Sequence, residues 1–226
     1  MANHLDLEEQ EQLDQIKHFW RQYGNAITWV LIVVLAGFAG WNFFQYWQRN
    51  QANQAAALFD EVERSVQSAD LAKVDRVFVE MKDRFASTIY AQQSALLVAR
   101  LYVDAGKFDA ARAALTWVAE QSGDAGYQAL ARLRMTAILM ELKEYDAAKK
   151  LLDGAVPASF AALVADRKGD IMALKSDKKQ AIVEYEKAYQ LLDSRNEYRR
   201  LVEVKLNAMG VDVQGREQVA LASGKQ

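Results

Sequence analysis

The sequence AITWVLIVVLAGFAGWNFFQYW, residues 26–47, decides how the rest of the chain is organised. It lies inside a run from Gln22 to Gln48 that contains no charged side chain. The hydrocarbon core of a bilayer is about 30 Å thick, so a spanning helix needs about 20 apolar residues. Ala26 to Phe44 supplies that length, and aromatic residues flank it on both sides, where amphipathic rings favour the headgroup region. The stretch predicts one transmembrane helix, over residues 25–47.

Two other interpretations of this segment are weaker. A buried helix of a soluble protein is usually shorter and carries polar residues on one face. A cleaved signal peptide needs a short basic leader, whereas residues 1–24 carry five acidic side chains against Lys17 and Arg21. An uncleaved signal anchor is therefore the better interpretation. The two basic residues before the span, against Arg49 after it, mildly favour a cytoplasmic N-terminus.

Residues 1–24 form the predicted tail in front of the span. Leu13, Ile16 and Trp20 recur in this tail at near-helical spacing, with acidic residues on the other face, which indicates a short amphipathic helix. Two interpretations stay open at this point. The tail is either a solvated lead-in without a partner or a recognition element on the cytoplasmic side.

The span itself contains a pair of small residues four positions apart, Ala36 and Gly40. Small residues at this spacing let two transmembrane helices approach closely, so the pair predicts a contact with another span. The alternative is that these residues reflect the ordinary composition of membrane helices, in which Gly and Ala are common.

The composition of the chain restricts its fold and its chemistry. One proline and 11 glycines among 226 residues leave little material for the turns of an all-β fold, so we expect an almost entirely helical protein. There is no cysteine, which excludes disulfides and thiol chemistry. After residue 24 the acidic and basic residues nearly balance, so electrostatics gives no case for nucleic-acid binding.

An internal repeat begins near residue 92. Segments that start at Ala95, Arg132 and Ala165 share a helix, a tight turn and a second helix that opens with a small residue. A spacing of 37 and then 33 residues is typical of tetratricopeptide-like repeats. The shared register places three sets of residues in equivalent positions, namely Ala111, Ala148 and Ala181, then Leu115, Leu152 and Tyr185, then Val118, Ala155 and Ala188.

The other segments complete an all-α architecture of one transmembrane helix followed by a tetratricopeptide-like helical solenoid over residues 48–213. Residues 51–68 and 71–85 are expected to form a helical hairpin ahead of the repeats. Residues 194–213 are expected to close the solenoid as a capping helix that Gly210 ends. Residues 214–226 are weakly patterned and predict a loose C-terminal tail.

Catalytic chemistry has little support in this sequence. The two histidines, His4 and His18, both precede the span, so the large domain has no histidine for a triad or a metal site. Acid pairs such as Glu184 and Glu186 are far more often solvated helix faces than acid–base pairs. Phosphate- and dinucleotide-binding glycine motifs are absent. We therefore expect a non-enzymatic protein without a cofactor or metal.

Binding is the function that a solenoid serves best. If the repeat register holds, the first helix of each repeat lines the concave face and forms a shallow groove for a segment of a partner. An equally good interpretation at this point is that several of these apolar residues are core between the repeats. The predicted groove consists of Leu96, Arg100, Val103, Leu133, Ala137, Met140, Asp166 and Asp170.

Several motifs together resemble one known family. These motifs are Glu8-Glu9-Gln10, the lead-in from Lys17 to Gly24, the exit from Trp41 to Trp47, and the final helix from Val202 to Met209. Together with the degenerate repeats they are similar to the YfgM-type ancillary translocon subunits of Gram-negative bacteria. The similarity covers nearly the whole chain, and the N-terminal elements are its most specific part.

The resemblance implies a single-pass protein of the bacterial inner membrane, with its N-terminus in the cytoplasm and its repeat domain in the periplasm. It also implies association with the SecYEG translocon and with a membrane-anchored chaperone of the PpiD type, and assistance to secreted client proteins. It carries over no catalytic residue. Two alternatives are a structural scaffold for an envelope assembly or cell-division complex, and a peptide receptor that faces the cytoplasm.

Overall fold

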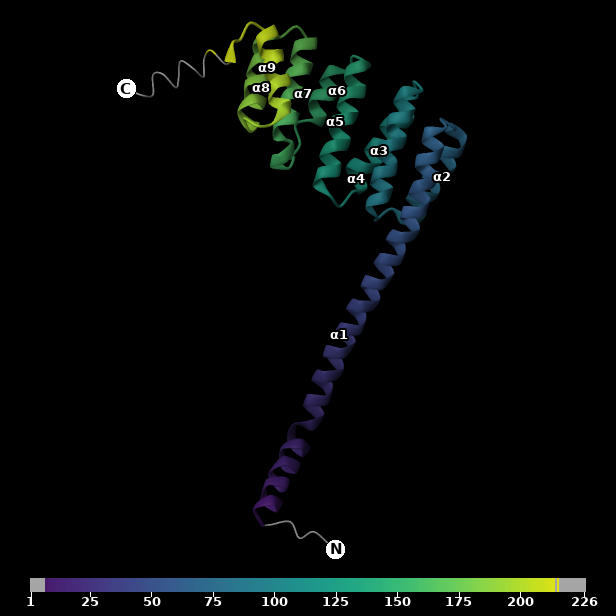
Figure 1. Ribbon diagram of the computed structural model, residues 1–226, viewed down its shortest axis with the longest axis vertical. Coiled ribbons are helices and arrows are strands. Elements are labelled where there is room, and N and C mark those ends of the chain that lie inside the picture. Colours follow the sequence, from purple (N-terminus) through teal and green to yellow (C-terminus); the bar gives the residue numbers. More distant parts are fainter. Residues whose placement is uncertain (1–6, 214, 216–226) are drawn as a thin grey trace, which may run out of the picture. The chain divides into compact units, whose positions relative to one another are not determined.

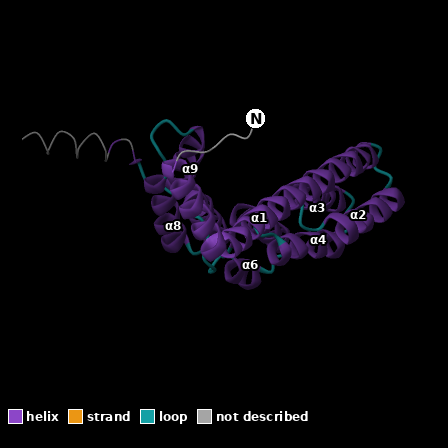
Figure 2. Ribbon diagram, turned by 90° about the horizontal axis from the view of Figure 1, so that it is seen from below, coloured by secondary structure: helices purple, strands orange, loops and turns teal. Residues whose placement is uncertain are grey.

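The computed structural model describes residues 7–213 and 215, with side chains from residue 13 onward. The secondary structure of these residues is helical, and no strand occurs among them (Figure 2). The predicted all-α fold is therefore confirmed. The chain divides into two compact units, residues 1–53 and 54–226, which are described separately. The predicted domain boundaries after residues 24, 47 and 213 stay predictions, and the predicted C-terminal tail lies outside the described residues except for residue 215.

Helix α1, Leu7–Gln67, supplies the first unit and enters the second. In the first unit its large apolar side chains are exposed, with Val33 at 66%, Phe38 at 68% and Trp41 at 63% exposed. None of the residues in the most apolar 18-residue stretch of α1 is buried, and the helix is long enough to cross a membrane. Because apolar surface left in water is unfavourable, this segment fits a lipid environment, in agreement with the predicted span.

The second unit consists of short helices joined by tight turns, and Figure 1 shows them following one another in chain order. The end of α1 and helix α2 form the hairpin that the sequence predicts. Side chains cap several helices, for example Asp124, which accepts hydrogen bonds from the amides of Gly126 and Tyr127. The remaining elements are α2 (Leu71–Phe85), α3 (Ile89–Asp104), α4 (Phe108–Gln121), α5 (Ala125–Glu141), α6 (Tyr145–Leu151), the 3-10 helix η1 (Ala158–Phe160), α7 (Ala161–Leu174), α8 (Lys178–Leu191) and α9 (Glu197–Ala208).

Five helices in this unit end in the same backbone turn. Ala69, Gly106, Lys143, Ser176 and Gly210 all adopt positive φ angles, between 52° and 81°. In each turn the amide of the following residue donates to the carbonyl oxygen four residues before the turn residue, at 2.7 to 3.2 Å. This is the Schellman arrangement, which satisfies carbonyl groups that a helix end leaves unpaired. The turns recur every 33 to 37 residues and therefore mark the true repeat register.

The turn at Ala69 reveals a repeat that the sequence analysis did not recognise. It makes the end of α1 and α2 the first helix pair of the solenoid, ahead of the three pairs predicted. Val74, Phe78 and Met81 are buried in α2 at the positions that hold Ala, Leu and Val in α4. Val74 stands where the other repeats have alanine, which hid the similarity. The turn at Gly210 ends α9, as predicted, and continues the register beyond the third predicted repeat.

The second predicted repeat differs from expectation in its last part. Ala155 was expected to be equivalent to Val118 and Ala188, but it is exposed and lies outside α6, which ends at Leu151. Gly154 and Pro157 disfavour a longer helix there. The chain instead runs through an irregular connection to η1, so the second helix of this repeat is only seven residues long.

Helix α5 lies between two hydrophobic clusters and is buried on two faces. Ala131, Met135 and Ile138 belong to the cluster shared with the helices before it, whereas Leu133 and Leu139 belong to the cluster shared with those after it. Each repeat of a solenoid buries one face against each neighbour, so this arrangement is the expected one for a central helix. It also fixes the rotation of α5 about its axis, and hence which of its side chains reach the surface.

Lys143 and Ser176 adopt left-handed conformations, with a φ of 61° at each, that strain any residue with a Cβ atom. Replacing either residue by glycine is expected to raise the free energy of unfolding by up to about 1 kcal/mol, because glycine occupies this region without strain. Urea unfolding of the full chain in detergent measures the change. The matched control is Leu142→Gly, one residue earlier at a φ of −77°, which is expected to destabilise. Destabilisation by Lys143→Gly and Ser176→Gly as well would contradict the strained turn.

Candidate functional site

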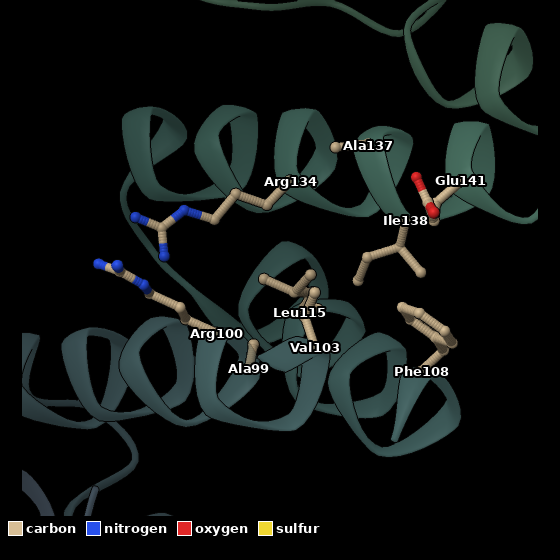
Figure 3. Close-up of a pocket in the computed structure, with 9 residues that line it drawn as sticks. All are labelled: Ala99, Arg100, Val103, Phe108, Leu115, Arg134, Ala137, Ile138 and Glu141. Atoms are coloured by element: carbon tan, nitrogen blue, oxygen red, sulfur yellow. The ribbon is translucent and has the colours of Figure 1, made fainter. Parts of the chain in front are cut away.

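A cavity of about 460 Å³ lies between α3, α4 and α5 (Figure 3). Its apolar wall includes Ala99, Leu115 and Ile138, which are all less than 5% exposed. Val103 and the half-buried ring of Phe108 extend this wall. A mostly apolar concave site of this volume is typical of places where proteins bind a ligand or a segment of a partner.

Charged side chains stand at the rim of the cavity. Arg100 and Arg134 extend from α3 and α5 on the same side, and Glu141 lies further along α5 (Figure 3). The guanidinium of Arg134 donates to the carbonyl oxygen of Leu96 at 2.9 Å, which ties α5 to α3. Burial lowers the pKa of Arg134, and the positive charge of Arg100 lowers it further. The rim therefore brings two cations together beside an apolar wall.

The structure brings three of the predicted groove residues to this cavity, namely Arg100, Val103 and Ala137. Leu96 and Leu133 are instead only 6% and 9% exposed and lie in the hydrophobic core. For these two leucines the structure agrees with the alternative interpretation, that they pack between repeats.

The other predicted site residues lie elsewhere. Met140 is half-buried against the second hydrophobic cluster. Asp166 and Asp170 belong to α7 and lie in a cluster of polar side chains described below. The predicted membrane-contact residues Ala36 and Gly40 are exposed on α1, and a Cβ atom added to Gly40 would meet nothing within 4 Å.

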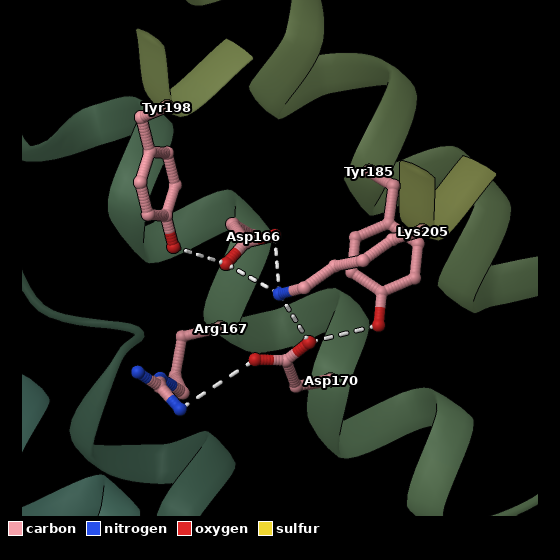
Figure 4. A network of polar contacts seen from close by, with 6 residues as sticks. All are labelled: Asp166, Arg167, Asp170, Tyr185, Tyr198 and Lys205. Atoms are coloured by element: carbon pink, nitrogen blue, oxygen red, sulfur yellow. Dashed lines mark hydrogen bonds and ion pairs between the residues drawn. The ribbon is translucent and has the colours of Figure 1, made fainter. Parts of the chain in front are cut away.

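The polar cluster joins α7 to α8 and α9 (Figure 4). The ammonium of Lys205 on α9 donates to both carboxylate oxygens of Asp166, at 2.8 Å each, and to Asp170 at 2.7 Å. The hydroxyl of Tyr198 donates to Asp166 at 2.7 Å, and that of Tyr185 donates to Asp170 at 2.8 Å. Burial, then these hydrogen bonds to carboxylates, raise the pKa of both tyrosines well above the ordinary value. Asp166 is only 1% exposed, so the cluster contains a buried charge. Its hydrogen bonds hold the last helix, α9, against α7.

Sequence reasoning missed the cavity residues of α4, Phe108 and Leu115, and two residues of α5, Arg134 and Ile138. The first pair comes from a second helix of a repeat, whereas the predicted groove was drawn from first helices alone. The second pair depends on the exact rotation of α5, because Leu133 and Arg134 are neighbours in sequence but point about 100° apart on a helix. The Schellman turns, spaced 33 to 37 residues apart, set the register but not this rotation.

The site has the means for non-covalent binding. Among the residues that the structure describes, no group of three or more His, Cys, Asp or Glu side chains is arranged to hold a metal ion. The cavity supplies apolar surface, two guanidinium groups and one carboxylate. Such a set recognises a ligand by shape and charge.

The fold and the cavity define a class of protein. Helix pairs that repeat every 33 to 37 residues, with small or medium residues at the close approaches, form a tetratricopeptide-like solenoid. Among the described residues, one helix, α1, is apolar and long enough to cross a membrane, and its apolar segment precedes the repeats in the sequence. The class is thus a solenoid protein with a candidate membrane anchor.

Comparison with known proteins gives the family. The family model for a tetratricopeptide repeat-like domain matches residues 17–211. A protein of Neisseria gonorrhoeae named ancillary SecYEG translocon subunit is 32% identical over 92% of this chain and 100% of its own length. Proteins of the same name from Haemophilus influenzae and Escherichia coli are 32% and 25% identical, over 81% and 90% of this chain and 90% and 97% of theirs. The chain belongs to the tetratricopeptide repeat-like family, and within it to the YfgM-type ancillary SecYEG translocon subunits.

Proposed function

We propose that this protein is a non-enzymatic, single-pass subunit of the inner membrane that associates with the SecYEG translocon and captures polypeptide segments there. The names of the relatives support the association, since five of them share the name ancillary SecYEG translocon subunit. The observation that carries the capture of segments is the cavity between α3 and α5, which joins an apolar wall to charged side chains.

The orientation and the partners are part of this proposal. The N-terminal tail faces the cytoplasm and the solenoid faces the periplasm, which the distribution of basic residues around the span supports. In that compartment the solenoid works with a PpiD-type chaperone and assists secreted proteins as they emerge. The span contributes the contact with other membrane helices, and the exposed surface at Ala36 and Gly40 is where the closest approach is expected.

Co-purification tests the association. The tagged full chain is purified from native membranes in mild detergent, and SecY and the chaperone are quantified by mass spectrometry. We expect both to be enriched, and Gly40→Leu to reduce the recovery of SecY because a larger side chain separates the helices. Thr28→Leu, at a position in the same span away from this pair, is the matched control and is expected to leave recovery unchanged. Absence of SecY, with envelope-assembly or cell-division factors recovered instead, would favour the scaffold and contradict the proposal.

A further inference from the structure

Two arginine side chains share one end of the cavity with little negative charge to balance them. The Nε atom of Arg100 is 4.0 Å from Asp104, and both side chains of this pair are mostly exposed, at 79% and 66%. An exposed ion pair at this distance contributes little. Within the described part of the chain, no carboxylate is paired with Arg134, whose guanidinium instead donates to a main-chain carbonyl oxygen. This end of the cavity therefore favours an anionic group.

The wall beside the arginines is apolar and already formed. Leu115 and Ile138 are 1% and 4% exposed, so their positions are fixed by the core behind them. Ala137 is small and exposed, and it leaves room at the entrance to the cavity. At about 460 Å³ the space takes a large apolar side chain such as leucine or phenylalanine together with the main chain that carries it.

The third feature of the site is Glu141, a negative charge away from the two arginines that would fix the orientation of a bound peptide. Glu141 follows Arg134 by seven residues on α5, which corresponds to about 10 Å along a helix axis. An extended peptide advances about 3.3 Å per residue, so it covers this separation in about three residues. A basic or amide-bearing side chain three positions from an anionic one would therefore reach Glu141.

We propose that this cavity binds an extended protein segment that carries an acidic side chain next to a bulky apolar one, with a basic or amide-bearing residue three positions from the acid. The carboxylate lies between Arg100 and Arg134, the apolar side chain packs on Leu115 and Ile138, and the third residue meets Glu141. This inference rests on the proposed function, because it names the chemistry of the segments that the solenoid captures.

The test uses the full chain in nanodiscs and fluorescent dodecapeptides of Ser, Gly and Asn with a central Glu-Leu-Ser-Lys. The peptides are acetylated and amidated, so the only carboxylate is the side chain. We expect this peptide to bind about tenfold tighter than its Gln-Leu and Glu-Ser versions, as one charge-assisted hydrogen bond or one buried leucine predicts. Fluorescence anisotropy measures the dissociation constants. Added salt is expected to weaken the binding of the Glu-Leu peptide more than the binding of the Gln-Leu peptide.

Variants locate the binding. Arg100→Gln, at an exposed side chain, is expected to fold normally and to reduce the preference for Glu over Gln markedly, because only Arg134 then remains to bind the carboxylate. Arg134→Lys keeps the positive charge and is expected to retain part of the preference for Glu over Gln. Arg76→Gln, an exposed arginine on α2 outside the cavity, is the matched control and is expected to change nothing.

Any of several outcomes would overturn the inference. These are equal binding of the Glu and Gln peptides, an unchanged preference in Arg100→Gln, and no binding of the Glu-Leu peptide at about 1 mM, a concentration that detects even weak complexes. Tighter binding of an acid-free peptide with a free C-terminus would also overturn it, in favour of a terminal carboxylate. If the preference fails while SecY still co-purifies with the protein, only this inference falls and the proposed function stands.

Discussion

Lys205→Met is expected to lower the free energy of unfolding by about 3–5 kcal/mol, the usual cost of breaking a buried ion pair by removing one partner. The ammonium of Lys205 lies between Asp166 and Asp170 and bonds to both at 2.7 to 2.8 Å (Figure 4). Asp166 is 1% exposed, so its buried charge would lose the ammonium that pairs with it, whereas Asp170 would keep Arg167 at 3.5 Å. Tyr198 would continue to donate to Asp166, but a neutral donor does not replace a cation.

Urea unfolding of the full chain in detergent, followed by circular dichroism, measures this loss. Lys187→Met on α8 is the matched control, because Lys187 is exposed and its replacement should change stability by less than about 0.5 kcal/mol. We also expect amide hydrogen exchange in α9 to accelerate more than in α3, since Lys205 ties the last helix to its neighbour. A loss no larger than that of the control would show that the cluster does not stabilise α9.

Gly169→Ala is expected to cost about 1–3 kcal/mol, which is the range for overpacking a core. A Cβ atom at Gly169 on α7 would lie 2.5 Å from the ring of Tyr185 on α8, closer than any real contact. The equivalent positions in the two preceding repeats hold Ala99 and Thr136, and the residue in the register of Tyr185 is leucine in both. In these three repeats the largest residue at this position of the second helix, Tyr185, thus coincides with the smallest residue at the matching position of the first.

This pairing of sizes makes the effect reversible by a second substitution. Tyr185→Leu should reduce the cost of Gly169→Ala, so that the double variant is more stable than the sum of the single effects predicts. Gly123→Ala is the matched control, because a Cβ atom there would meet nothing within 4 Å. Equal costs of Gly169→Ala with Tyr185 and with leucine at that position would show that the ring is not what excludes the side chain.

Much of the fold was predictable because local patterns in the sequence indicate it. An uncharged apolar run defines the candidate span, and small residues spaced 37 and then 33 residues apart define three helix pairs. The first pair was missed because Val74 replaces the small residue that carries the pattern, while its turn at Ala69 carries no glycine. The shortened helix α6 was missed because the repeat suggested a full-length helix, although Gly154 and Pro157 oppose one.

The candidate site was less predictable, since it depends on how helices are rotated and paired. Arg100, Val103 and Ala137 follow from the register alone, and all three line the cavity. Leu96 on α3 and Leu133 on α5 occupy a different register position, equivalent in their two repeats, and both are buried in the hydrophobic clusters. Asp166 and Asp170 could not be assigned from the sequence, because their partner Lys205 lies more than 30 residues away.

Site-specific photo-crosslinking from Ala137 tests the central claim most directly. A photoreactive amino acid at this exposed position of the cavity entrance is compared with one at Val183, which is 56% exposed on α8 outside the cavity. In cells that secrete an arrested nascent chain, we predict crosslinks from Ala137 to the chain or to the chaperone, and markedly fewer from Val183. Equal crosslinking from both positions, or crosslinks only to envelope-assembly factors, would contradict the account of a solenoid that captures polypeptide segments at the translocon.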